Sequence, residues 1–75
     1  MDRKKLVEID EMLIKHEATA MANVDEKTRE LLLVIRKGKF ASTISCAADN
    51  INYAALKDAI AGQLKKMEAK QNEKA

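Results

Sequence analysis

The chain of 75 residues has no proline or tryptophan, two glycines, one cysteine, one histidine and two aromatic side chains, Phe40 and Tyr53. A single cysteine excludes an internal disulfide, and one histidine with one cysteine excludes a Cys/His zinc site. A lone cysteine also indicates a reducing compartment, so we expect a cytoplasmic location. The scarcity of proline and glycine, with many good helix formers, favours a mainly α-helical chain with an aliphatic core.

Charge is abundant but balanced, with a net charge of +2, which is too small to indicate nucleic acid or membrane binding. No segment approaches the roughly 20 apolar residues of a membrane span, and no signal peptide is visible, so no membrane partner is expected. We predict a single small domain over residues 1–75, with a polar tail that frays over 68–75. A chain this short buries only about 60–65% of its unfolded surface, which favours stabilisation by self-association as a homodimer.

Residues 3–22 are predicted to form the first helix, because their apolar side chains recur at helical spacing. They form two stripes: Leu6, Ile9, Met12, Leu13, His16 and Ala20 in one, and Val7, Ile14, Ala18 and Met21 in the other. Two stripes imply either that this helix lies between two others or that one stripe contacts a second chain.

A second helix is predicted over 26–37, with Asp25 as its N-cap and Gly38 at its C-terminal end. It contains the apolar run LLLVI at 31–35, which is also compatible with a buried strand. The flanking EKTRE and RK favour the helix, because they are helix formers whose charges suit the helix dipole.

The segment FASTISCAADNINYAAL over 40–56 carries one charge, Asp49. Residues 40–46 are predicted to be extended, with a short helix capped by Ser42 as the alternative. A lone strand has unpaired edges, and a second copy of the chain is the simplest partner for it.

The last helix is predicted over 52–70, capped by Asn50 or Asn52, with an apolar stripe from Tyr53 to Met67. The fold class is therefore predicted as mainly α, a bundle of three helices with one short extended segment, associating as a homo-oligomer. The surfaces expected to meet a partner are the second stripe, the uncharged segment and a small-residue patch on the last helix. Their residues are Val7, Ile14, Met21, Phe40, Ile44, Tyr53, Ala55, Ala59 and Gly62. The alternative is that these side chains fill a compact three-helix core.

A basic cluster near Gly38 is a candidate anion site for a nucleotide or nucleic acid. It combines three cations with two neighbouring hydroxyls: Arg36, Lys37, Lys39, Ser42 and Thr43. The structural alternative is a helix C-terminus whose cations complement the dipole. His16 as a base or metal ligand, and Cys46 as a nucleophile, lack orienting or activating neighbours in the sequence, so no catalytic residue, metal or cofactor is expected.

The order LLLVIRKGK, FASTISC and DNINYAALKDAI resembles small helical proteins encoded by bacteria and their phages. The likeness covers about residues 26–64. It implies an accessory factor that binds and inhibits host machinery or sequesters a small signal. We therefore expect a non-enzymatic regulatory protein that binds another macromolecule, with nucleotide or nucleic-acid binding through the basic cluster as the alternative.

Overall fold

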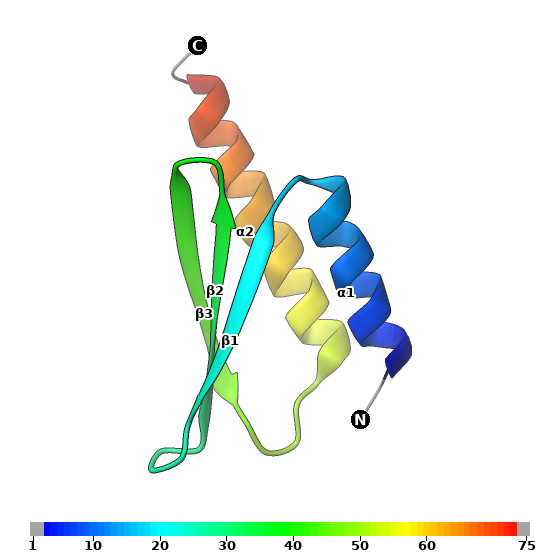
Figure 1. Cartoon of the computed structure of the whole chain (residues 1–75), viewed down its shortest axis with the longest axis vertical. Helices are drawn as coiled ribbons and strands as arrows, with labels where there is room; N and C mark the ends of the chain where they lie inside the picture. The colour runs from blue at the N-terminus through cyan, green and yellow to red at the C-terminus, as the bar shows by residue number, and fades with distance from the viewer. Residues whose placement is uncertain (1–2, 74–75) are drawn as a thin grey trace.

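The computed structural model describes residues 3–73 and contains a three-stranded antiparallel sheet with two helices on one of its faces (Figure 1). The elements follow the order α1 (Arg3–Lys15), β1 (Thr19–Asp25), β2 (Glu30–Lys37), β3 (Phe40–Ala47) and α2 (Tyr53–Glu73). The strand order is β1-β2-β3. The prediction of a mainly α, three-helix bundle is therefore wrong, because the chain from 19 to 47 forms a sheet.

The first helix ends at Lys15, not at 22, because the backbone reverses at Glu17, which has a positive φ of 55°. The Ala18 amide donates to the Leu13 carbonyl at 2.8 Å, and the Glu17 amide donates to the Ile14 carbonyl at 3.0 Å. These are the two hydrogen bonds of a Schellman motif, in which a left-handed residue ends the helix. Glycine usually occupies that position. Because the residue here is Glu17, the end of the helix was not predicted from the sequence.

The apolar run at 31–35, predicted as helix, forms the centre of β2. Leu31, Leu33 and Ile35 are buried beneath the helices, and the side chains between them point to the bare face of the sheet. Alternation of burial with a period of two is the property of a strand. Asp25, the predicted N-cap, instead accepts hydrogen bonds from two amides of the β1–β2 loop, those of Lys27 and Thr28.

A two-residue turn joins β2 to β3, and its first residue, Gly38, has a φ of +60°. Glycine in this position is typical of a type II′ hairpin turn, so Gly38 ends a strand and not the predicted helix. The extended segment expected over 40–46 corresponds to β3, which pairs along its length with β2. It is therefore not a lone strand, and it has a partner within its own chain.

The predicted last helix corresponds to α2, and the Asn52 side chain caps it by accepting a hydrogen bond from the Ala55 amide at 3.1 Å. The helix continues to Glu73. Residues 68–73 of the expected frayed tail are thus helical, and 74–75 lie outside the described residues. The core lies between the sheet and the two helices, and its fully buried side chains are Ile35, Ile60 and Leu64.

Candidate binding cleft between α1 and β1

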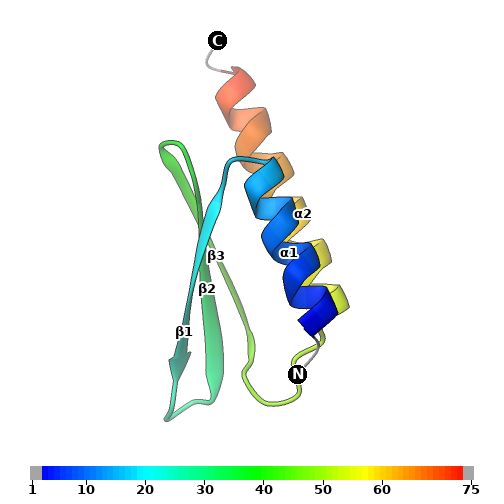
Figure 2. The same cartoon turned by 45° about the vertical axis from the view of Figure 1, so that its right-hand side comes forward.

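The helical and sheet layers meet at one end and separate toward the other, so that α1 and β1 diverge from the turn that joins them (Figures 1 and 2). A cleft of about 650 Å³ lies between them. Its walls are α1 on one side and β1 with β2 on the other, and α2 forms its floor. We call this space the α1–β1 cleft.

The side chains that line the α1–β1 cleft are almost all apolar. Both helices contribute, together with two strands: Leu6, Ile9, Leu13, Ile14, Ala18, Ala20, Ala22, Leu31, Leu33, Ile51, Tyr53, Leu56 and Ile60, with Thr19 as a polar member. Asp10 is the only charged residue among them. An apolar recess with few polar groups is the usual form of a protein binding site.

The sheet wall of the cleft is incomplete because β1 is an edge strand. Every residue of β1 is exposed, including Val24 at 47%. The helices thus leave the inner face of β1 uncovered, although they bury the corresponding face of β2. Among residues 3–73, no strand pairs with the outer edge of β1. This edge also lacks the usual protection, since β1 has no lysine or proline and its one charge, Asp25, lies at its end.

The helical wall of the cleft also exposes apolar surface at its mouth. Ile14 is 74% exposed and lines the cleft. Val7, two helical turns earlier on the same face of α1, is 55% exposed. Large exposed aliphatic side chains at the mouth of an open cleft indicate a surface that gains stability when it is covered.

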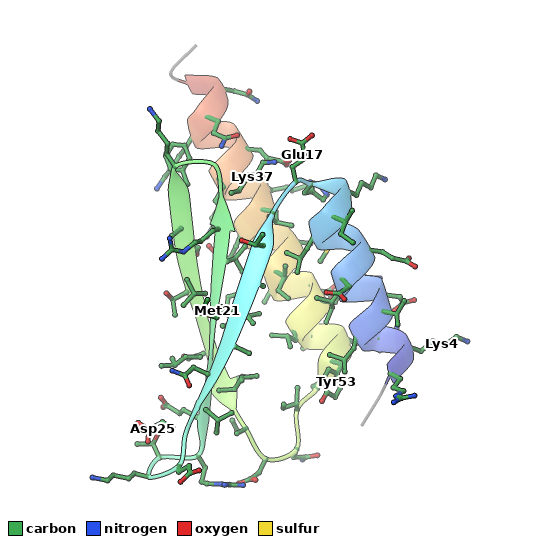
Figure 3. The ribbon with its side chains drawn as sticks, in the orientation of Figure 1. Lys4, Glu17, Met21, Asp25, Lys37 and Tyr53 are labelled. Carbon is green, nitrogen blue, oxygen red and sulfur yellow. The ribbon has the colours of Figure 1, made fainter. Side chains whose placement is uncertain are left out.

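A polar cluster lies at the end of the molecule where the turn joins α1 to β1. His16 Nδ1 lies 2.9 Å from Glu68 Oε2, and Lys37 Nζ, whose side chain is only 14% exposed, lies 3.7 Å from the same oxygen. Lys37 also donates to the His16 carbonyl. The hydrogen bond from His16, with a smaller contribution from Lys37, lowers the pKa of Glu68 below its ordinary value. These contacts join the turn after α1 to β2 and α2, and Figure 3 shows Lys37 at this end of the molecule.

A second ion pair lies at the opposite, open end, where Figure 3 shows Asp25 beside the β1–β2 loop. Arg29 in this loop donates to both carboxylate oxygens of Asp49, at 2.6 and 3.2 Å. The hydrogen bonds lower the pKa of Asp49 and raise the pKa of Arg29. The single charge of the segment 40–56 therefore ties two loops together, and neither of these residues lines the cleft.

The structure separates the predicted interface residues into three groups. Val7, Ile14 and Met21 are exposed, and Met21 lies on β1 on the face turned away from the helices. Phe40, Ile44 and Tyr53 are half-buried against the core. The remaining three are exposed on α2: Ala55, Ala59 and Gly62. A Cβ placed on Gly62 would meet nothing within 4 Å, so no other element within residues 3–73 packs closely there.

The predicted anion site is not assembled as one cluster. Arg36 and Lys37 are neighbours on β2 and therefore point to opposite faces of the sheet. Lys37 is paired with Glu68, and the Ser42 hydroxyl donates to Gln63 Oε1 at 2.6 Å. The two other members are exposed elsewhere: Lys39 in the β2–β3 turn and Thr43 on the outer face of β3.

The two residues considered for catalysis or metal binding are not brought together. His16 contacts Glu68, and Cys46 is a half-buried free thiol on β3. Within the described part of the chain, no group of three or more histidine, cysteine, aspartate or glutamate side chains is placed to hold a metal ion. Nor does any helix in residues 3–73 have the length and apolar character needed to cross a membrane.

The sequence interpretation missed the β1 wall of the cleft because it assigned these residues to a helix. A signal was present: residues 18–24, ATAMANV, carry no charge in a chain that is 35% charged. Residues 40–56, with one charge, show the same kind of gap.

Comparisons with protein-family models, with curated proteins and with solved structures find no match to this chain.

Proposed function

We propose that this protein is a small non-enzymatic interaction module that binds another protein through the α1–β1 cleft. One observation carries the proposal: an open apolar cleft of about 650 Å³ lies beside an edge strand whose seven residues are all exposed. Exposed apolar surface of this extent beside unpaired backbone is unfavourable in water, and a partner that covers it removes both costs. Regulation or inhibition of the bound protein would be the mode of action.

The test uses a photo-crosslinking amino acid at Ile14, at the mouth of the cleft, in cells that naturally encode the chain. The expected result is that one protein is crosslinked at Ile14 and not from a matched position at Lys66, which is exposed on α2 away from the cleft. Pull-down of the same protein should be lost with Ile14→Lys, which places a charge in the cleft, and retained with Lys66→Glu. Equal capture from both positions, or retention with Ile14→Lys, would refute binding at the cleft.

The alternative, a nucleotide or nucleic-acid binder, is separated from the first proposal by salt. Binding to phosphates weakens steeply between low and moderate salt, because it releases counterions. Burial of apolar surface does not weaken in this way. A complex that persists unchanged in high salt, and that survives the double change Arg36→Gln and Lys39→Gln, would exclude the alternative.

A further inference from the structure

The hydrogen-bond ladder determines which backbone groups of β1 face outward. The Ala48 amide donates to the Arg29 carbonyl at 2.8 Å, in continuation of the β2–β3 register. Because bonding and non-bonding positions alternate in an antiparallel ladder, the even-numbered residues of β2 direct their amides and carbonyls toward β1. Their register partners are the odd-numbered residues of 19–25. The residues whose amide and carbonyl point away from the sheet are therefore Ala20, Ala22 and Val24.

The same three residues place their side chains on the inner face of the sheet, toward the α1–β1 cleft, because Ala20 and Ala22 are among its lining residues. Two of them are alanines, which leave room above the strand. A chain segment lying beside β1 would thus find unpaired hydrogen-bonding groups along its flank. On its inner face it would find the apolar surface of α1, including Ile14 at 74% exposure.

The two helices occupy the helical layer asymmetrically. Helix α2 contacts β2 and β3, and α1 lies beyond α2 on the β1 side (Figures 1 and 2). One further strand beside β1 would lie next to α1 and complete the sheet beneath it. The edge of the sheet at β3 has less space for an added strand. The cleft beside β3 is about 340 Å³, and the inner face of β3 is half-buried under α2.

We infer that the occupant of the α1–β1 cleft is an extended peptide segment of a partner protein, added as a fourth strand to β1. This inference rests on the proposed function and names the kind of partner. Alternate side chains of the segment enter the cleft and are apolar, and one of them is basic, because the only charged lining residue is Asp10. Strand addition of this kind takes its affinity from the backbone and its specificity from alternate side chains.

A second copy of this chain fits the site less well. Two chains paired antiparallel through β1, about a two-fold axis perpendicular to the sheet, would place their helical layers on the same face of the joined sheet. Because α1 already lies on the β1 side of that layer, the two α1 helices would meet across the axis. A single extended segment has no such neighbour.

The test begins with a library of random twelve-residue peptides displayed on phage, selected on the full chain and counter-selected on Ile14→Lys. The enriched peptides should have apolar residues at alternate positions with a lysine or arginine. The best peptide is then synthesised and titrated into the ¹⁵N-labelled chain. The amides of Ala20, Ala22 and Val24 should become protected from hydrogen exchange. Two forms of the peptide are then compared, one methylated at the odd-numbered backbone nitrogens and one at the even-numbered. Only one form should lose binding, because only alternate amides of an added strand face β1.

Two proline variants supply the matched pair. Ala22→Pro removes an outward amide of β1, and Ala41→Pro removes an outward amide of β3, so neither breaks the β2 ladders. We expect at least tenfold weaker peptide binding by Ala22→Pro and no change by Ala41→Pro, with both circular dichroism spectra retained.

The outcomes separate the two proposals. Binding that is lost with Ile14→Lys but unchanged by Ala22→Pro refutes strand addition and leaves the cleft as the binding site. Binding that both variants leave unchanged, or a selection that enriches no peptide, refutes the cleft as well. If the free chain is dimeric by light scattering and becomes monomeric with Ala22→Pro, the occupant of the cleft is a second copy of the chain and not a peptide.

Discussion

A pair of isoleucine substitutions can show whether the α1–β1 cleft is open in solution. The two side chains lie on the two helices, and one is fully buried whereas the other is largely exposed. Ile60 on α2 is fully buried at the floor of the cleft, and Ile14 on α1 is 74% exposed at its mouth. Substituting each by alanine removes the same atoms from the same kind of backbone. The two changes differ chiefly in how much of the side chain is packed.

The expected losses follow from burial. Replacing a buried isoleucine by alanine costs about 2–5 kcal/mol in unfolding free energy. Since Ile60 borders a cleft that water reaches, the lower part of this range applies, and we expect about 2–3 kcal/mol for Ile60→Ala. For Ile14→Ala we expect a change within about 0.5 kcal/mol, as for other exposed positions. A domain of this size has about 4–11 kcal/mol of stability in total, so the first loss is severe.

Urea denaturation followed by far-ultraviolet circular dichroism measures both changes, with a common slope as the check on two-state behaviour. In thermal unfolding, Ile60→Ala should lower Tm by about 10–20 °C and Ile14→Ala by less than about 4 °C. A loss above about 1 kcal/mol for Ile14→Ala would show that this side chain is buried in solution. A dilution series would then tell closure of the cleft, which is independent of concentration, from self-association.

Three further predictions concern β1, the end of α1 and the polar cluster around Glu68. In the free chain, amide hydrogen exchange should alternate along β1, with fast exchange confined to Ala20, Ala22 and Val24; uniform protection would mean that the edge is already paired. Glu17→Gly should raise stability by about 0.5–1 kcal/mol, because glycine relieves the positive φ, whereas Glu11→Gly in the middle of α1 should lower it by about 1 kcal/mol. The pKa of Glu68 is lowered in the folded chain, so protonation of Glu68 at acidic pH should remove stability that is present at higher pH. The urea midpoint should therefore fall more between pH 6 and pH 3 for the wild type than for Glu68→Gln. Equal falls would contradict the pairing with His16.

Those parts of the fold that depend on local signals were predictable. The Asn52 cap and the apolar stripe of α2 are formed by residues three or four positions apart along one helix, and the structure has both. The β propensity of residues 40–46 likewise corresponds to β3. In each case the determining interactions are short-range in sequence.

The strand β2 was not predictable from its pattern, because the outer face of the sheet is not polar along its centre. Leu32 and Val34 point to that bare face, so apolar residues follow one another without the alternation that identifies a half-buried strand. Such a run matches a buried helix equally well. Its pairing with the neighbouring strands β1 and β3 in two hairpins makes it a strand, and the pattern of residues 31–35 alone does not contain that pairing.

Large exposed hydrophobic side chains lie elsewhere than in residues 40–56. That segment is largely accounted for within the chain: β3 pairs with β2, Asp49 pairs with Arg29, and Tyr53 packs against the core. The large exposed hydrophobic side chains lie on α1, β1 and β2: Val7, Ile14, Met21, Val24 and Leu32. Met21 and Leu32 lie on the outer face of the sheet, whereas Ile14 lines the α1–β1 cleft and Val24 lies on the inner face of β1. Exposed apolar surface and the unpaired backbone edge therefore coincide on the cleft side of β1. A partner that covers this region satisfies both at once, whereas one that binds the β3 edge would leave the larger apolar area in water.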